Sequence, residues 1–235
     1  MDIHPGIEMI DLALYLKKHK TLVIADLHIG FEEALAKQGV LVPRFQYKDM
    51  IDRLEQVFAR VKPETVVLNG DLKHAFGAIT KQEWKETMRL FDYLSRKCKE
   101  IIVVKGNHDP NIGPITRKKA VRVVDELAFD GVVIAHGDSI PKARNPAVII
   151  MGHEHPAVSL REKGRVEKFK CFLKGRFRKS VLLVQPSFNV CVEGSDVTKE
   201  DVLSPLITNI RDFEVFVVDD VRKKTLYFGK VKDLI

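Results

Sequence analysis

The sequence contains few cysteines, and they are far apart. Only three occur among the 235 residues, Cys98, Cys171 and Cys191, and no two of them have the C-x-x-C spacing. An odd number of scattered cysteines argues against a disulfide framework and against a cysteine-based zinc site. We therefore expect buried thiols in a core that a chain of this length can build without covalent cross-links.

Long apolar segments are also missing. No stretch approaches the roughly 20 apolar residues that span a membrane, and the beginning, MDIHPGIEMIDLALYLKKHK, places acidic residues among the apolar ones. We expect a cytoplasmic protein without a membrane partner. Because no linker rich in Pro, Gly or Ser divides the chain, residues 1–235 are predicted to form one domain.

Acidic residues are scarce in one segment. The chain carries a formal net charge of +7, and residues 161–179 contain nine basic residues against only Glu162 and Glu167. Such a run forms either a solvated hairpin or a surface that binds a polyanion. We expect a basic strand or hairpin insertion here, which leaves phosphate-rich partners open.

Three basic residues of this segment are candidates for substrate binding, namely Lys168, Lys170 and Arg176. Phenylalanines are interleaved with them at positions 169, 172 and 177. These rings could stack on nucleobases, or they could face the core, because alternate positions of a strand point inward.

Short apolar runs rich in β-branched residues recur along the chain. They predict buried strands at residues 21–25, 65–69, 100–104, 131–135, 147–151 and 180–184. Amphipathic patterns between the first runs predict helices at 31–39, 43–61 and 81–97. After about residue 130 strands follow one another, and 214–220 and 225–231 predict a hairpin around VRKK. The pattern indicates an α/β protein with two packed sheets flanked by helices.

A small polar cluster follows each of five predicted strands. The clusters read DLH, GD, GNHD, HGD and GHEH, and six of the eight histidines lie within or just after them. Each cluster alone is typical of a turn. Ligands collect beyond the carboxyl ends of the strands in an open α/β sheet, so we expect the five clusters to converge. In the last cluster, His153 and His155 can point to one side while Glu154 faces away.

The converging side chains suit metal ions. Seven candidate ligands offer imidazole nitrogens, carboxylate oxygens and one amide oxygen: Asp26, His28, Asp71, Asn107, His136, His153 and His155. This set favours divalent ions, Mn²⁺ foremost, with Fe²⁺, Co²⁺, Zn²⁺ or Ni²⁺ as alternatives. Seven ligands are too many for one ion, so we predict two ions with Asp71 as the bridge.

The ordered series D-x-H, G-D, G-N-H-D, H-G and G-H-x-H, over roughly residues 20 to 160, resembles the calcineurin-like metallophosphoesterase superfamily. ADLHIG, GDLKH and QPSFNVCVEG are similar to an archaeal branch related to SbcD, the nuclease subunit of a DNA repair complex, and to ligase-associated phosphoesterases. The resemblance implies a four-layer α-β-β-α sandwich with two mostly mixed sheets.

The resemblance also implies roles for the site residues. One ion would be held by Asp26, His28, Asp71 and His155, and the other by Asp71, Asn107, His136 and His153. His108 matches a catalytic histidine on the substrate side, and Asp109 matches the carboxylate that orients it. His74 matches a histidine of the nuclease members, while the Asp-Arg pair of the protein phosphatases is missing.

These features predict a metal-dependent phosphodiesterase or nuclease that acts on nucleic acid by in-line attack of a metal-bound hydroxide. One alternative is a phosphodiesterase or phosphatase for a cyclic nucleotide or a nucleotide-linked small molecule. Another is a non-catalytic scaffold, although such relatives typically lose ligands and none is lost here. The basic insertion and the C-terminal hairpin could each form an oligomer interface.

Overall fold

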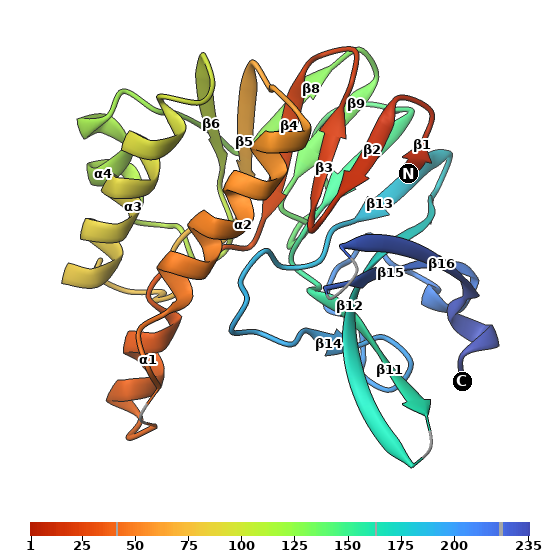
Figure 1. The fold of residues 1–235 in the computed structure, drawn as a ribbon. Helices are drawn as coiled ribbons and strands as arrows, with labels where there is room; N and C mark the ends of the chain where they lie inside the picture. The colour runs from red at the N-terminus through yellow and green to blue at the C-terminus, as the bar shows by residue number, and fades with distance from the viewer. Residues whose placement is uncertain (41, 163, 221–222) are drawn as a thin grey trace.

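The computed structural model describes residues 1–40, 42–162, 164–220 and 223–235, with only the backbone described for Glu162. Residue 163 of the predicted basic insertion and residues 221–222 of the predicted C-terminal hairpin lie outside this description. The described chain forms two mixed β-sheets, and α-helices cover the outer face of the first (Figure 1).

The first sheet has seven strands that follow one another in chain order. The strands are β1 (Asp2–His4), β2 (Ile7–Ile10), β3 (Ala13–Leu16), β4 (Thr21–Ala25), β5 (Thr65–Asn69), β6 (Glu100–Val104) and β7 (Arg122–Val124). The pairs from β1 to β4 are antiparallel, and those from β4 to β7 are parallel. As a result, β4, β5 and β6 end at the same edge.

The helices connect the parallel strands of this sheet. They are α1 (Phe31–Lys37), α2 (Gln46–Arg60), α3 (Lys81–Leu94) and α4 (Gly113–Lys118). α2 begins three residues after Pro43, because the Glu32 carboxylate accepts hydrogen bonds from the backbone N–H groups of Phe45 and Gln46, both at 2.7 Å. α3 begins at a capping box in which Thr80 and Glu83 satisfy each other's backbone N–H groups.

The second sheet has nine strands. They are β8 (Glu126–Phe129), β9 (Val132–Ala135), β10 (Val148–Met151), β11 (Pro156–Glu162), β12 (Arg165–Phe177), β13 (Ser180–Val184), β14 (Ser195–Asp196), β15 (Glu214–Asp219) and β16 (Lys224–Lys230). β9, β10 and β13 are parallel, so they also end together. The prediction of two mixed sheets in an α/β protein is confirmed.

The outer layer of the second sheet differs from the predicted sandwich. Among the described residues, no α-helix follows α4. Irregular chain and two 3₁₀ turns, η1 (Ile210–Asp212) and η2 (Val231–Asp233), cover the sheet instead. Ile149 and Leu182 belong to the core cluster on this side, together with Ile207 and Val231. The side chains of these irregular segments cover the outer face of the second sheet, so no α-helix is required to bury it.

All six strands predicted from apolar runs are present in the two sheets. The strands at 21–25, 65–69, 100–104 and 180–184 have the predicted bounds, and the remaining two begin one residue later. The strands β1, β2 and β3, by contrast, were not predicted. Their hydrophobic pattern is interrupted by turns at Gly6 and Asp11, so that no run has the length of the later strands.

The long strand β12 takes part both in a projecting hairpin and in the second sheet. Its first half pairs with β11 in a projecting hairpin, and its second half pairs with β13 and β15 in the sheet. Phe172 is buried in the core that the two sheets share, and Phe177 is buried in the core on the outer side of the second sheet. The half-buried Phe169 packs against this outer core. Phe172 and Phe177 therefore face the core, and the alternative of base stacking is wrong for these two.

Candidate metal centre

All five polar clusters lie at the common edge where the parallel strands end. Asp26 and His28 follow β4, Asp71 follows β5, and Asn107 follows β6. His136 follows β9, and His153 and His155 follow β10. The two sheets thus bring residues 26 and 155 together, with 3.6 Å between the Asp26 Oδ2 and His155 Nε2 atoms.

The backbone turns sharply at these positions. Five of the seven candidate ligands have a left-handed backbone, with φ between 41° and 68°: Asp26, His28, Asp71, His153 and His155. Such φ values are uncommon for residues other than glycine, and their concentration at one edge is typical of a functional site.

The glycines of the motifs make room for ligands from other strands. A Cβ atom on Gly70 would lie 2.0 Å from Nδ1 of His136, and one on Gly106 would lie 2.1 Å from Oδ1 of Asp71. A Cβ atom on Gly152 would lie 2.4 Å from Oδ2 of Asp26. The glycine in each motif is therefore required by a side chain more than 20 residues away in the sequence.

One group of ligand atoms surrounds Nε2 of His136. This nitrogen lies 2.9 Å from Oδ1 of Asn107, 3.1 Å from Nδ1 of His153 and 3.5 Å from Oδ2 of Asp71. Four potential ligand atoms from four loops thus face a common point.

A second group surrounds Nε2 of His28. This nitrogen lies 3.2 Å from Nε2 of His155 and 3.7 Å from Oδ2 of Asp71. Asp26, His28 and His155 offer ligand atoms within 4.8 Å of one another, as do Asp71, His136 and His153. The same oxygen of Asp71 therefore lies close to both groups, which is the position that a bridging carboxylate would take.

The placement of buried polar atoms also suits a cation. Asp26 Oδ1 and His136 Nδ1 are buried and lie 3.4 Å from each other, without a hydrogen bond to any described residue. The Nε2 atom of His136 thus faces the other ligand atoms, and a carboxylate beside the second nitrogen of a histidine is typical of metal ligands. The donor set of imidazole and carboxylate groups without thiolate matches divalent transition metals.

The pKa values of the candidate ligands in the metal-free protein also favour metal binding. Burial, followed by the charge of Asp26, raises the pKa of Asp71 to about 8. Burial also opposes ionisation of Asp26, but His155, His136 and His28 outweigh it and lower the pKa of that carboxyl group. Burial lowers the pKa of His136 to about 4 and that of His28 well below its usual value. These imidazoles are therefore neutral at pH 7, in the form that binds metals.

Comparison with known proteins agrees with this geometry. The sequence profile of the calcineurin-like phosphoesterases matches residues 19–169, which is more than half of the chain. The chain belongs to the calcineurin-like phosphoesterase family. No curated protein matched it. It is thus a phosphate-ester hydrolase of a family that depends on two metal ions, with clusters of His and Asp that could bind them.

Solved structures extend the likeness to the whole fold. The chain is similar to nuclease MPE of Pseudomonas putida, with 19% identity, a TM-score of 0.70 and coverage of 97% of this chain and 98% of that one. A protein of unknown function from Aquifex aeolicus is 18% identical over 61% of this chain and 81% of that one, with a TM-score of 0.37. A Vps29 double mutant from Entamoeba histolytica is 15% identical over 89% and 99%, with a TM-score of 0.33.

His108 and His74 lie beside the second ligand group of this phosphoesterase. Nδ1 of His108 hydrogen-bonds to the backbone carbonyl of His74, and its Nε2 lies 3.8 Å from Oδ2 of Asp71. The His74 ring is nearly parallel to that of His108, with 5.6 Å between centroids, and its Nδ1 lies 3.5 Å from Nδ1 of His28. The two histidines predicted to be catalytic are thus brought to the metal centre.

The role predicted for Asp109 is wrong. Its carboxylate accepts hydrogen bonds from the backbone N–H groups of Leu72, Lys73 and Gly106, and not from the His108 ring. Burial raises its pKa to about 6. Asp109 therefore fixes the loops after β5 and β6, and the His74 carbonyl orients the His108 imidazole.

Two of the predicted substrate-binding residues are placed elsewhere. The Lys170 ammonium donates a hydrogen bond to the Ser187 carbonyl at 2.7 Å and another to that of Asn189, and burial lowers its pKa to about 7. Arg176 pairs with Val181 near the start of β13, away from the edge where the ligands lie. Lys168 lies on the projecting hairpin, where its ammonium donates to the Gly194 carbonyl at 3.2 Å and lies 3.8 Å from the Glu200 carboxylate.

The loop that Lys170 holds was not predicted to support the site. Ser187 Oγ donates to the Asp26 carbonyl at 2.7 Å, and Gln185 donates to the Val23 carbonyl at 3.0 Å. The loop after β13 thus fixes the turn that carries Asp26. The sequence QPSFN that marks it contributes no ligand, so ligand chemistry alone could not reveal it.

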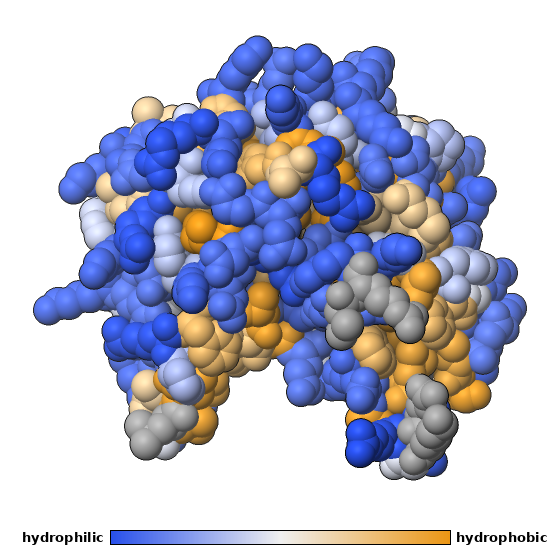
Figure 2. All heavy atoms as spheres, viewed as in Figure 1, coloured by the Kyte–Doolittle hydropathy of each residue, from blue (hydrophilic) through white to orange (hydrophobic). Residues whose placement is uncertain are grey.

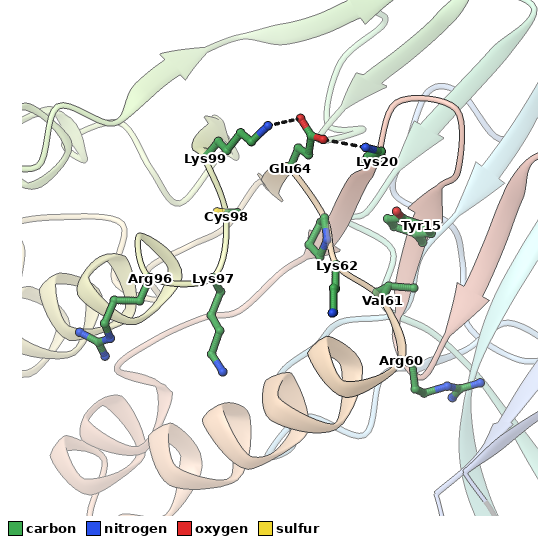
Figure 3. A pocket seen from close by; sticks show the side chains of 11 residues that line it. Tyr15, Lys20, Arg60, Val61, Lys62, Glu64, Arg96, Lys97, Cys98 and Lys99 are labelled. Carbon is green, nitrogen blue, oxygen red and sulfur yellow. Dashed lines mark hydrogen bonds and ion pairs between the residues drawn. The ribbon is translucent and has the colours of Figure 1, made fainter.

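A separate hollow of about 720 Å³ lies at the opposite ends of the strands. In Figure 3, Lys20 and Lys99 flank Glu64, each with 2.8 Å between the charged atoms, while Arg60 and Arg96 point away in different directions. The basic residues of this hollow are thus partly neutralised and do not converge on one point.

In the described part of the chain, no helix is long and apolar enough to cross a membrane.

Proposed function

We propose that this phosphoesterase is a two-metal phosphodiesterase that hydrolyses nucleic acid. The observation that carries the proposal is the single oxygen of Asp71, which lies 3.7 Å from Nε2 of His28 and 3.5 Å from Nε2 of His136. One ion would be held by Asp26, His28, Asp71 and His155. The other would be held by Asp71, Asn107, His136 and His153, and Mn²⁺ suits both sets.

When bound, two divalent ions acidify a water molecule and neutralise charge on the phosphoryl oxygens. The protein's own contribution would be positioning and proton transfer. His108 is suited to this role because the His74 carbonyl occupies its Nδ1, which leaves Nε2 to face the substrate. Burial lowers the pKa of His108. The negative charge of a phosphodiester would favour its protonated form, which could protonate the leaving oxygen.

Two projections beside the metal centre support a polymeric substrate. α1 begins three residues after His28, and β11 begins directly after His155, so both grow out of ligand loops. In Figure 1, α1 and the β11–β12 hairpin project on the same side of the sheets. Figure 2 shows a hollow between these projections at the lower edge. A nucleic acid strand lying in this hollow would pass the candidate metal centre.

The β11–β12 hairpin carries basic residues on the face that it turns towards the candidate metal centre. Ser159 pairs with Lys168 and Arg161 with Val166, so Lys168 and Arg161 lie on the same face as Lys170. Lys170 reaches the loop that supports Asp26. Arg161 would therefore contact backbone phosphates, an interaction that weakens with salt. Lys168 would do so by exchanging its contacts with the Gly194 carbonyl and the Glu200 carboxylate for a phosphate.

The proposal is tested with protein stripped of metal. Mn²⁺, Co²⁺, Zn²⁺ and Mg²⁺ are added in turn, with bis-nitrophenyl phosphate, nitrophenyl phosphate and single-stranded DNA as parallel substrates. We expect the diester and DNA to be cleaved with Mn²⁺ and the activity to be lost in Asp71→Asn. Asp52→Asn, which changes an exposed acid in α2, is the matched control. Cleavage of the monoester alone, or of neither ester, would contradict the proposal.

A further inference from the structure

An exposed aromatic side chain lies beside the metal centre and has no part in the function proposed above. Phe76, in the loop after β5, exposes 60% of its surface. The centroid of its ring lies 3.6 Å from that of His108, with an angle of 33° between the planes. One face of the ring is therefore covered by an imidazole, and the exposed surface includes the other face.

The loop around Phe76 is held in place. The backbone N–H of His74 donates to the Ile29 carbonyl at 3.0 Å, and that of Ala75 donates to the Glu83 carboxylate at 2.7 Å. On the other side of Phe76, Asn111 donates to the Gly77 carbonyl at 3.4 Å. The ring is thus presented to solvent by a fixed loop, which reduces the entropy lost when a ligand binds to it.

The distance from the ring to the ligands is short. His108, which covers one face of Phe76, has its Nε2 atom 3.8 Å from the Asp71 oxygen that is close to both ligand groups. A planar group stacked on the free face of Phe76 would therefore be attached close to the reacting phosphate. In a nucleic acid, the planar group at that position is the base of an adjoining nucleotide.

We propose that Phe76 forms a nucleobase subsite, on which a base next to the scissile phosphate stacks. This inference rests on the proposed function and names the recognition element of the same site. Stacking on an aromatic ring tolerates all bases, because each has a π-face. The subsite would therefore position the strand without selecting a sequence. The competing explanation is that Phe76 only packs against His108 and holds its ring in place.

The test is a binding measurement, which does not depend on turnover. Affinities of the Mn²⁺-loaded protein for thymidine 5′-monophosphate and for 2-deoxyribose 5-phosphate are compared by calorimetry in wild type, Phe76→Ala and Phe76→Leu. Tyr227→Ala is the matched control, since Tyr227 is an aromatic residue with a similar exposure of 56% on β16. We expect the base to strengthen wild-type binding by roughly tenfold, within the range for base stacking.

We expect Phe76→Ala to abolish this preference, Phe76→Leu to lose most of it, and Tyr227→Ala to keep it. Equal wild-type affinity for the two ligands, or a preference that persists in Phe76→Ala, would overturn the proposal. So would an equal loss of affinity for both ligands in Phe76→Ala, which is the result expected if the ring only supports His108. Base-dependent binding without hydrolysis of any diester would sustain the subsite while contradicting the nuclease function.

Discussion

The buried carboxyl group of Asp71 makes the stability of the metal-free protein depend on pH in a way that metal should reverse. Its pKa is about 8 in the folded protein and 3.8 in a free chain, and the residue is only 3% exposed. Between these values the folded state holds a proton that the unfolded state has lost. Stability from this group is therefore complete below pH 4 and is lost as the pH rises to about 8.

The window from pH 6.5 to 8 covers the titration of Asp71, but other groups also titrate there. Lys170 has a pKa of about 7 in the folded protein, and the histidines whose pKa burial lowers release their protons in the unfolded chain. The contribution of Asp71 is therefore the difference between wild type and Asp71→Asn, which have these other groups in common. The proton linkage of Asp71 across this window corresponds to a loss of about 1.6 kcal/mol in the free energy of unfolding. In a protein of this size, that loss lowers the melting temperature by about 3 to 6 °C.

The assay is urea unfolding of EDTA-treated protein at pH 6.5 and 8, with wild type, Asp71→Asn and the control Asp52→Asn, which changes an exposed acid in α2. Between the two pH values, we expect the free energy of unfolding of wild type and of Asp52→Asn to fall by about 1.6 kcal/mol relative to that of Asp71→Asn, because an amide cannot ionise. With saturating Mn²⁺ this difference should disappear, since the ion takes the place of the proton and releases it. The reasoning is refuted if wild type and Asp71→Asn show the same dependence on pH.

Two further substitutions test the geometry of the site. His108→Ala should bind the same amount of metal, measured by elemental analysis, yet lose most DNA hydrolysis, since His108 belongs to neither of the proposed ligand sets; full activity on DNA would exclude a role for this ring in proton transfer. Gly70→Ala should weaken metal binding by about tenfold or more, as loss of support for a ligand does, because its Cβ would lie 2.0 Å from His136 Nδ1. Gly6→Ala is its matched control, because Gly6 has the same φ of +77° with nothing within 4 Å of the added Cβ. It should cost about 1 to 2 kcal/mol of stability and leave metal binding unchanged. Equal metal affinity in the two alanine variants would show that the His136 contact is unimportant.

The predicted convergence of the polar clusters was correct because it depends on local pattern and on one topological rule. Apolar runs such as 21–25 and 65–69 are long enough to be recognised as buried strands from the local sequence pattern alone. Since parallel strands end at one edge, residues that follow them meet there whatever lies between. The convergence of Asp26, Asp71 and His136 therefore followed from the sequence.

Roles that depend on which group a side chain contacts could not be predicted from the sequence. The adjacency of His108 and Asp109 suggested a pair, but Asp109 accepts hydrogen bonds from the loop after β5. Lys170 lies in a basic run, yet its ammonium is bound by two carbonyls of the loop after β13. In each case the partner is a backbone group distant in the chain, and backbone groups leave no mark on composition or spacing.

The sequence by itself thus determined the buried strands that end at the site and the types of ligand that follow them, because strand propensity and metal preference are properties of the residues themselves. Only the tertiary structure placed one oxygen of Asp71 close to both histidine groups and the Phe76 ring against His108. Those positions arise from packing two sheets face to face around a shared core, so that their strand ends meet, and distances across such a junction are set by every strand in both sheets.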